Sequence, residues 1–188
     1  GVKISPDSGT YSSYADLLIK NNFNYFNFLA QTDFVTPIVL YSAWITIVGI
    51  TKMIFGDSWN AAIVVLNYIT VIYTLVLILK AIRAVTLKPA CFIFALIAII
   101  FCYEFHMWIS YVLSDVMFAS LCFSILFISL NFFRDPFDAQ KWIISCLVLA
   151  IIATFFRPAF PPLLVFTFLS ILFGFTFAFI LGSENGKM

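Results

Sequence analysis

The side chains that could do chemistry in this sequence are a few charged residues set among long apolar runs. Ionisable groups at membrane depth are costly, so those that remain there are candidates for function. The charges that fall on one predicted side of the chain are Asp7, Asp33, Asp57, Glu104, His106, Asp115 and Arg157. A carboxylate of this kind can accept a proton, and an arginine can bind a phosphate through paired hydrogen bonds.

Arg157 and Asp115 stand at the ends of apolar runs. Arg157 closes the uncharged run "LAIIATFF", and Pro158, Pro161 and Pro162 prevent one continuous helix beyond it. An arginine on a broken backbone at a bilayer surface suits phosphate binding, although snorkelling toward lipid headgroups explains its position equally well. Asp115, in "YVLSDVMF", either caps the helix that begins there or takes part in chemistry.

The remaining charges also have ordinary structural explanations. Glu104 can mark the water end of a helix, His106 is of a type more often hydrogen-bonded at an interface than bound to a ligand, and Asp33 and Asp57 lie in turn sequences that suit helix caps. The sequence contains none of the GxGxxG, P-loop, HExxH or GxSxG motifs. A single histidine without a CxxC pair argues against a structural zinc site.

The composition predicts that these residues are carried by membrane helices. Of 188 residues, 63% are hydrophobic and 10% are charged, whereas soluble domains have about 45–50% and about 25%. A net charge of +1 gives no basic surface for nucleic acid. The four cysteines lie inside apolar runs and form no CxxC pair, so we interpret them as small buried apolar residues.

The apolar runs predict an all-α protein, a polytopic bundle of about five spanning helices with N-terminal extracytoplasmic juxtamembrane helices. The run 89–133 is too long for one span, because about 45 residues rise more than twice the thickness of the bilayer core. Its charges Glu104 and Asp115, with His106 between them, mark the turn. The expected spans are 61–79, 90–103, 116–133, 142–156 and 163–181.

Basic residues predict the orientation, because they are enriched in cytoplasmic loops. The two basic clusters are Lys80, Arg83 and Lys88, and Arg134 and Lys141. Placing both in the cytoplasm leaves Asp7, Asp115 and Arg157 outside, in a multi-pass protein of the inner or plasma membrane. The resulting divisions are an extracytoplasmic first loop with an amphipathic helix (1–36), an interfacial or re-entrant helix (37–59), a transmembrane bundle (60–182) and a cytoplasmic tail (183–188). For the segment 37–59, the alternative is a helix that spans the membrane at 37–55.

The order of several short motifs resembles a known class of membrane enzymes. The motifs are "PDSGTYSSYADLL", "IFGDSWNA", "ILKAIRAV", "YVLSDVMF" and "ATFFRPA". In this order they resemble the polytopic GT-C glycosyltransferases, in particular the protein O-mannosyltransferases and the lipid A aminoarabinose transferases. Members of that class use a polyprenyl-phosphate-linked sugar as donor.

The resemblance implies a set of roles. Asp7 matches the first-loop acid that serves as catalytic base, and Arg157 matches the basic residue near the lipid phosphate. The residues expected to bind substrate are Arg157, Asp115, Glu104, His106 and Tyr11. Asp7 and Asp115 would be the ligands of a divalent metal ion, if one is used. The implied partners are the polyprenyl-phosphate sugar donor, a lipid, glycan or protein acceptor, and membrane lipids, with no nucleic acid.

Members of the class are much longer and have a span before the first-loop acid. The resemblance therefore also implies that this chain is a fragment, with the remainder of a full-length protein as a partner. The alternative function is a non-enzymatic polytopic subunit or a transporter-like protein, in which the same outer charges line a substrate path or a partner surface.

Overall fold

The computed structural model describes residues 6–32, 39–85, 90, 93–94, 97, 109–131, 139–157, 162–172 and 176. Across these ranges the regular structure is helical, with no β-strand. The prediction of an all-α protein is therefore confirmed.

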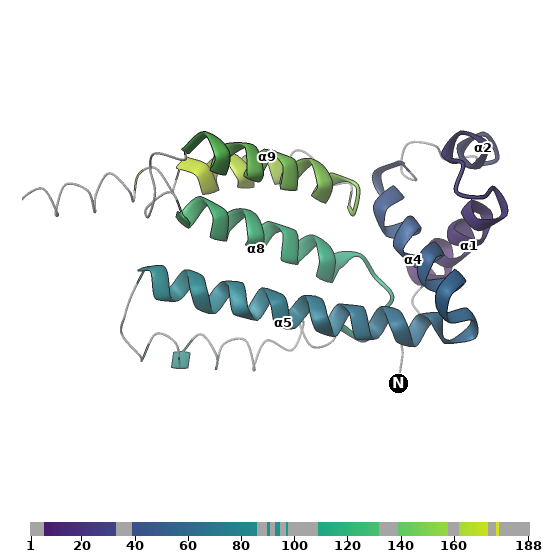
Figure 1. Ribbon diagram of the computed structural model, residues 1–188, viewed down its shortest axis with the longest axis horizontal. Coiled ribbons are helices and arrows are strands. Elements are labelled where there is room, and N and C mark those ends of the chain that lie inside the picture. Colours follow the sequence, from purple (N-terminus) through teal and green to yellow (C-terminus); the bar gives the residue numbers. More distant parts are fainter. Residues whose placement is uncertain are drawn as a thin grey trace, which may run out of the picture.

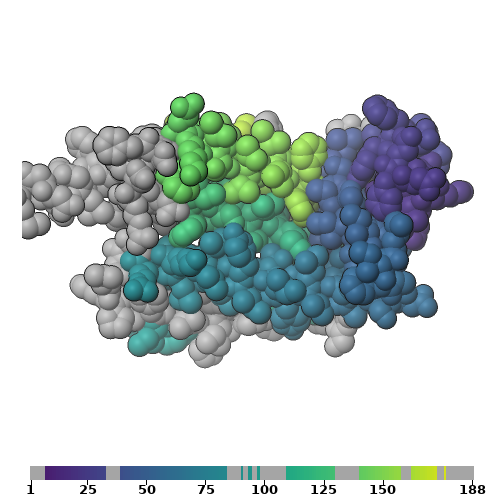
Figure 2. Space-filling view, in the orientation of Figure 1, coloured from purple at the N-terminus to yellow at the C-terminus, as the bar shows by residue number. Residues whose placement is uncertain are grey.

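Three short helices form a unit at one end of the molecule (Figure 1). They are α1 (Pro6–Lys20), α2 (Tyr25–Ala30) and α4 (Ser42–Phe55). Their shared core includes Leu18, Phe28 and Trp44, all with no exposed surface. Figure 2 shows this unit as a cluster of purple and blue side chains beside the longer helices.

The N-terminal segment is helical from its first described residues. Asp7 lies in the first turn of α1, because Pro6 is favourable at a helix start and an acid there complements the helix dipole. After α1, residues 25–30 form α2. The side chain of Asn24 caps it by accepting a hydrogen bond from the Asn27 N–H at 3.2 Å.

Longer helices form the rest of the molecule. In Figure 1, α5 (Trp59–Val85), α8 (Asp115–Asn131) and α9 (Ala139–Thr154) lie side by side with similar axes. Contacts join α5 to α8 and α8 to α9. A further helix, Pro162–Leu172, packs on the same core through Leu163. The first residues of α5 and α8 and the last residues of α9 all face the unit of α1, α2 and α4.

An elbow separates α4 from α5. It is the short 3-10 helix η1 (Gly56–Ser58), and Gly56 has φ = +53°, a conformation that side chains disfavour. The stretch Ser42–Arg83, which contains the elbow, is the one helical stretch in the described ranges that is long and apolar enough to cross a membrane. Three other apolar helices, Asp115–Ser129, Gln140–Thr154 and Pro162–Leu172, are shorter. The expected span 90–103 falls almost entirely outside the described residues.

The buried core between α8 and α9 includes Ile125 and several small or hydroxyl-bearing side chains. Ser120, Ser124 and Ser129 of α8 are buried, and so are Cys146 and Ala150 of α9. The serine hydroxyls at 124 and 129 donate to carbonyls one turn earlier, each at 2.9 Å, so their burial leaves no donor unpaired. Small residues let the two helix backbones approach closely, as in packed membrane helices.

Large apolar side chains lie on the outside of α5 and α9. On α9, Ile144, Leu147, Val148 and Ile151 are between 46% and 59% exposed. On α5 the exposed set includes Val65, Ile69 and Ile72. In a protein in water, large apolar residues are usually buried and polar residues exposed. Here several small polar residues are buried and many large apolar residues are exposed.

Asn67 connects α5 to the chain that leads into α8. Its side chain is fully buried, and its Nδ2 donates to the Ile109 carbonyl at 3.2 Å and to the Tyr111 carbonyl at 2.9 Å. Two carbonyls of an irregular segment thus obtain a donor that the backbone does not supply.

We expect Asn67→Ala to destabilise the fold by about 1–3 kcal/mol, because it leaves two buried carbonyls without a donor. Thermal unfolding of the purified chain, monitored by circular dichroism, measures the change. Ile72→Ala, on the exposed side of the same helix, is the control and should change stability much less. Equal stability of Asn67→Ala and the parent chain would contradict this account.

Candidate functional site

Asp115 and Arg157, two of the charged residues singled out from the sequence, meet at the end of the bundle that faces α1, α2 and α4. Asp115 is the first residue of α8, and Arg157 follows the last turn of α9. The Arg157 guanidinium forms an ion pair with the Asp115 carboxylate. Their side chains are 48% and 28% exposed, respectively, so the pair remains open to a ligand from solvent.

The end of α9 and the start of α8 explain the positions of the two residues. α9 ends at Thr154, and the Phe155 and Phe156 N–H groups turn back to the Ile152 and Ala153 carbonyls, both at 3.1 Å. Asp115 lies in the first turn of α8, where a negative charge is favoured by the helix dipole. A helix start and a helix end, side by side, therefore bring opposite charges together.

Tyr11 links this pair to α1. Its ring packs against Tyr41 with centroids 5.2 Å apart, and its hydroxyl interacts with the side chains of Tyr41 and Ser114. Burial raises the pKa of Tyr11 well above its ordinary value, and Tyr41 and the negative charge of Asp7 raise it further. The phenol is therefore a neutral group that can donate a hydrogen bond, placed between Asp7 and the residue that precedes Asp115.

Ser8 was not singled out from the sequence, yet it fixes the start of α1. Its buried hydroxyl donates to the Val112 carbonyl at 3.0 Å, across 104 positions of sequence. Asp7, its neighbour, is exposed. A serine among several serines and threonines carries no signal in a single sequence, so only the fold shows this contact.

A hollow opens between the helices α5, α8 and α9. It has a volume of about 380 Å³ and lies between α5 and α8, with the end of α9 as its third wall. Its lining includes Ile69 and Tyr73 of α5, Met117 and Leu121 of α8, and Phe156, the neighbour of Arg157. Phe156 is the one phenylalanine in this lining.

The predicted metal ligands do not form a complete set in the described part of the chain. No group of three or more histidine, cysteine, aspartate or glutamate side chains gathers there, and Asp115 is paired with Arg157. Glu104, His106 and Asp33 lie outside the described residues. Metal binding by Asp7 and Asp115 stays a prediction, and Arg157 is the cation that the structure places at this site.

No family model matches the sequence, and no curated protein or solved structure matches it. The likeness to GT-C glycosyltransferases consequently rests on the short motifs and their order.

We expect Asp115 and Arg157 to be energetically coupled by about 0.5–1 kcal/mol, the range for partly exposed ion pairs. A double-mutant cycle with Asp115→Asn, Arg157→Gln and the double variant, followed by chemical denaturation, measures the coupling. Because the Arg157 side chain is half exposed, raising salt from about 0.1 to about 1 M should reduce the coupling. Strictly additive effects at low salt would show that the pair does not form.

Proposed function

We propose that this chain is an integral-membrane glycosyltransferase, or part of one, that transfers a sugar from a polyprenyl-phosphate-linked donor to an extracytoplasmic acceptor. The observation that carries the proposal is the ion pair of Arg157 with Asp115, next in the chain to Phe156, which lines an apolar hollow. The motif order that resembles the GT-C class supports it independently.

The membrane setting is the first part of the proposal. α5 has 27 residues and rises about 40 Å, enough to cross the hydrocarbon core. α8 and α9 have 17 and 16 residues, near the lower limit of about 17 for a span, and large apolar side chains of α9 face outward. With 90–103 and 163–181, these helices make the proposed five-span bundle, with Asp7, Asp115 and Arg157 on the outer side.

The helix α4 suits the outer interface. Its 14 residues rise about 21 Å, which is short of a full span. Near its end, Ile50, Met53, Ile54 and Phe55 are each at least 45% exposed, so one side of the helix can enter the acyl layer while α1 covers another.

The donor would be held by its two chemically distinct parts. The Arg157 guanidinium would bind the phosphate by paired hydrogen bonds, with Asp115 keeping the guanidinium in place. The first isoprene units would enter the hollow past Met117 and Phe156, where the walls are mostly apolar. A polyprenyl phosphate has a charged phosphate joined to a hydrocarbon chain. Arg157 would suit the phosphate, and the apolar hollow would suit the chain.

The transfer step would then use Asp7. The acceptor oxygen attacks the anomeric carbon, the bond from that carbon to the phosphate oxygen breaks, and polyprenyl phosphate leaves with the electron pair. Asp7 takes the acceptor's proton as general base. Arg157 stabilises the negative charge that grows on the phosphate, and the neutral Tyr11 hydroxyl can hold a polar group of the sugar.

We expect Arg157→Ala to lower sugar transfer about a hundredfold to a thousandfold, because it removes the charge that stabilises the leaving phosphate. Asp7→Asn should lower transfer by a similar or larger factor, because it removes the base. Transfer of labelled sugar from a polyprenyl-phosphate donor, in membranes that express the variants, measures both.

The matched control is Arg83→Ala, which removes an exposed arginine near the far end of α5 and should leave transfer unchanged. Full sugar transfer by both Arg157→Ala and Asp7→Asn, at normal expression, would refute the proposed glycosyltransferase mechanism. Binding of the donor by the parent chain without any transfer would favour a non-enzymatic subunit.

We expect Asp7 and Arg83 to lie on opposite sides of the membrane. Asp7→Cys should react with a membrane-impermeant maleimide in intact cells, and Arg83→Cys should react only after permeabilisation, because both positions are exposed. The parent chain, with its four native cysteines, sets the background. Labelling of Asp7→Cys only after permeabilisation would remove Asp7 from the proposed site.

A further inference from the structure

A second hollow lies at the elbow between α4 and α5, on the outer edge of the proposed membrane domain. It has a volume of about 350 Å³ and takes its walls from α1, α4, η1 and the start of α5. Its ionisable lining residues are Asp16, Lys52 and Asp57, and Trp59 forms part of the same wall. None of them belongs to the site of Arg157.

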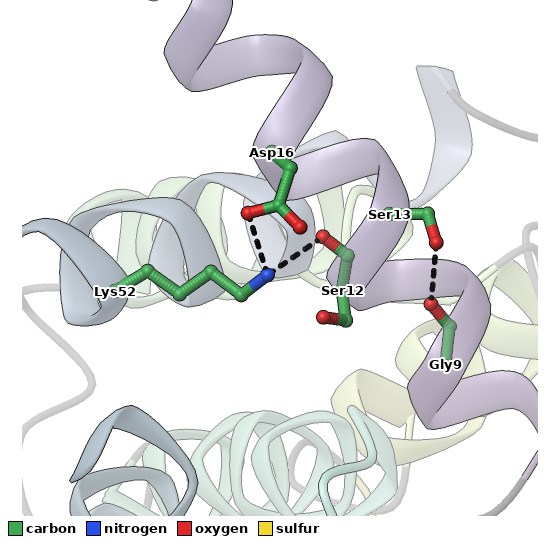
Figure 3. Close-up of polar contacts among 5 residues, drawn as sticks. All are labelled: Gly9, Ser12, Ser13, Asp16 and Lys52. Carbon is green, nitrogen blue, oxygen red and sulfur yellow. Dashed lines mark hydrogen bonds and ion pairs between the residues drawn. The ribbon is translucent and has the colours of Figure 1, made fainter. Parts of the chain in front are cut away.

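Lys52 uses its hydrogen-bonding capacity within the protein. Its Nζ lies 2.7 Å from Asp16 Oδ1 and 3.0 Å from the Ser12 carbonyl oxygen, and both contacts are drawn in Figure 3. The same nitrogen lies 5.0 Å from the centroid of the Trp59 ring. An ammonium group has three donors, and here two point at α1 while the third side faces an aromatic ring. The Lys52 side chain is 13% exposed, so it offers little to a ligand.

The hollow is left with an excess of acceptors. Asp16 is 63% exposed and pairs with Lys52 through one carboxylate oxygen, and its other oxygen is not engaged in that pair (Figure 3). Asp57 is exposed and forms no ion pair with the described residues. Two carboxylates against one ammonium give this lining a net charge of −1, which favours a cationic ligand that donates hydrogen bonds.

Apolar surface continues directly from the rim. Met53 lines the hollow, and Ile54 and Phe55 follow it in the chain, with exposed fractions of 63%, 67% and 53%. Trp59 begins the helix proposed to cross the membrane, and tryptophan is enriched at the level of lipid headgroups. A cation-binding hollow that borders an apolar edge at this depth fits a molecule with an amine head and hydrocarbon tails.

We propose that the hollow at the elbow binds the primary ammonium of an aminophospholipid, phosphatidylethanolamine, through Asp57 and Asp16, with the acyl chains against Met53, Ile54 and Phe55. The proposal rests on the membrane setting of the proposed function and is independent of sugar transfer. It gives the elbow a role as a lipid-selective contact that holds α4 at the surface.

Native mass spectrometry of the full chain released from nanodiscs tests the idea. The nanodiscs contain phosphatidylcholine with equal amounts of phosphatidylethanolamine and phosphatidylglycerol. The parent chain should retain phosphatidylethanolamine over phosphatidylglycerol by about two- to fivefold, the range set by partly exposed charge pairs. Asp57→Asn should reduce this preference, and Asp57→Glu, which keeps the charge, should preserve it.

The outcomes distinguish failure of the proposed lipid site from failure of the proposed glycosyltransferase activity. An unchanged preference in Asp57→Asn, or a preference of the parent chain for phosphatidylglycerol, would overturn the lipid site alone. Asp7→Asn, which tests the enzyme, should keep the lipid preference of the parent chain. A chain that does not enter nanodiscs at all would overturn the membrane setting and this site together.

Discussion

The close approach of α8 and α9 is the constraint on which the rest of the structure depends. Ile125 of α8 packs against Cys146, Ala150 and Ala153 of α9, and Ser129 contacts Cys146, so the small residues of α9 allow a close approach. Larger residues on this face would separate the helices. Because the helices are antiparallel neighbours, the end of α9 lies beside the start of α8, and Arg157 reaches Asp115. The same approach closes one side of the apolar hollow.

The N-terminal unit completes this end of the bundle through a different kind of contact. Tyr11, Ala15 and Leu18 of α1 share a core with α4, with Ile63 of α5 and with Val112 before α8. That core is ordinary apolar packing, and it carries the polar contacts of Ser8 and Tyr11 on its edge. The start of α1 is thereby held against Val112, three positions before Asp115.

The elbow shows how one lysine can join three helices. Lys52 belongs to α4, binds α1 through Asp16 and the Ser12 carbonyl, and lies against Trp59 of α5. The left-handed conformation of Gly56 reverses the chain there. The arrangement fixes the direction of α4 relative to the bundle and leaves uncompensated carboxylate charge at the surface, which is the origin of the proposed lipid contact.

By itself, the sequence determined the helical class and the approximate ends of α5, α8 and α9. These follow from local properties: apolar run length, backbone restriction and the cost of charge in an apolar environment. It also singled out Asp115, Arg157, Tyr11 and Asp7. Only the tertiary structure decided that Asp115 pairs with Arg157, that Ser8 anchors α1 and that Lys52 spans three helices. Such contacts depend on the relative placement of distant helices, and a periodic pattern specifies which side of a helix is buried but not which neighbour buries it.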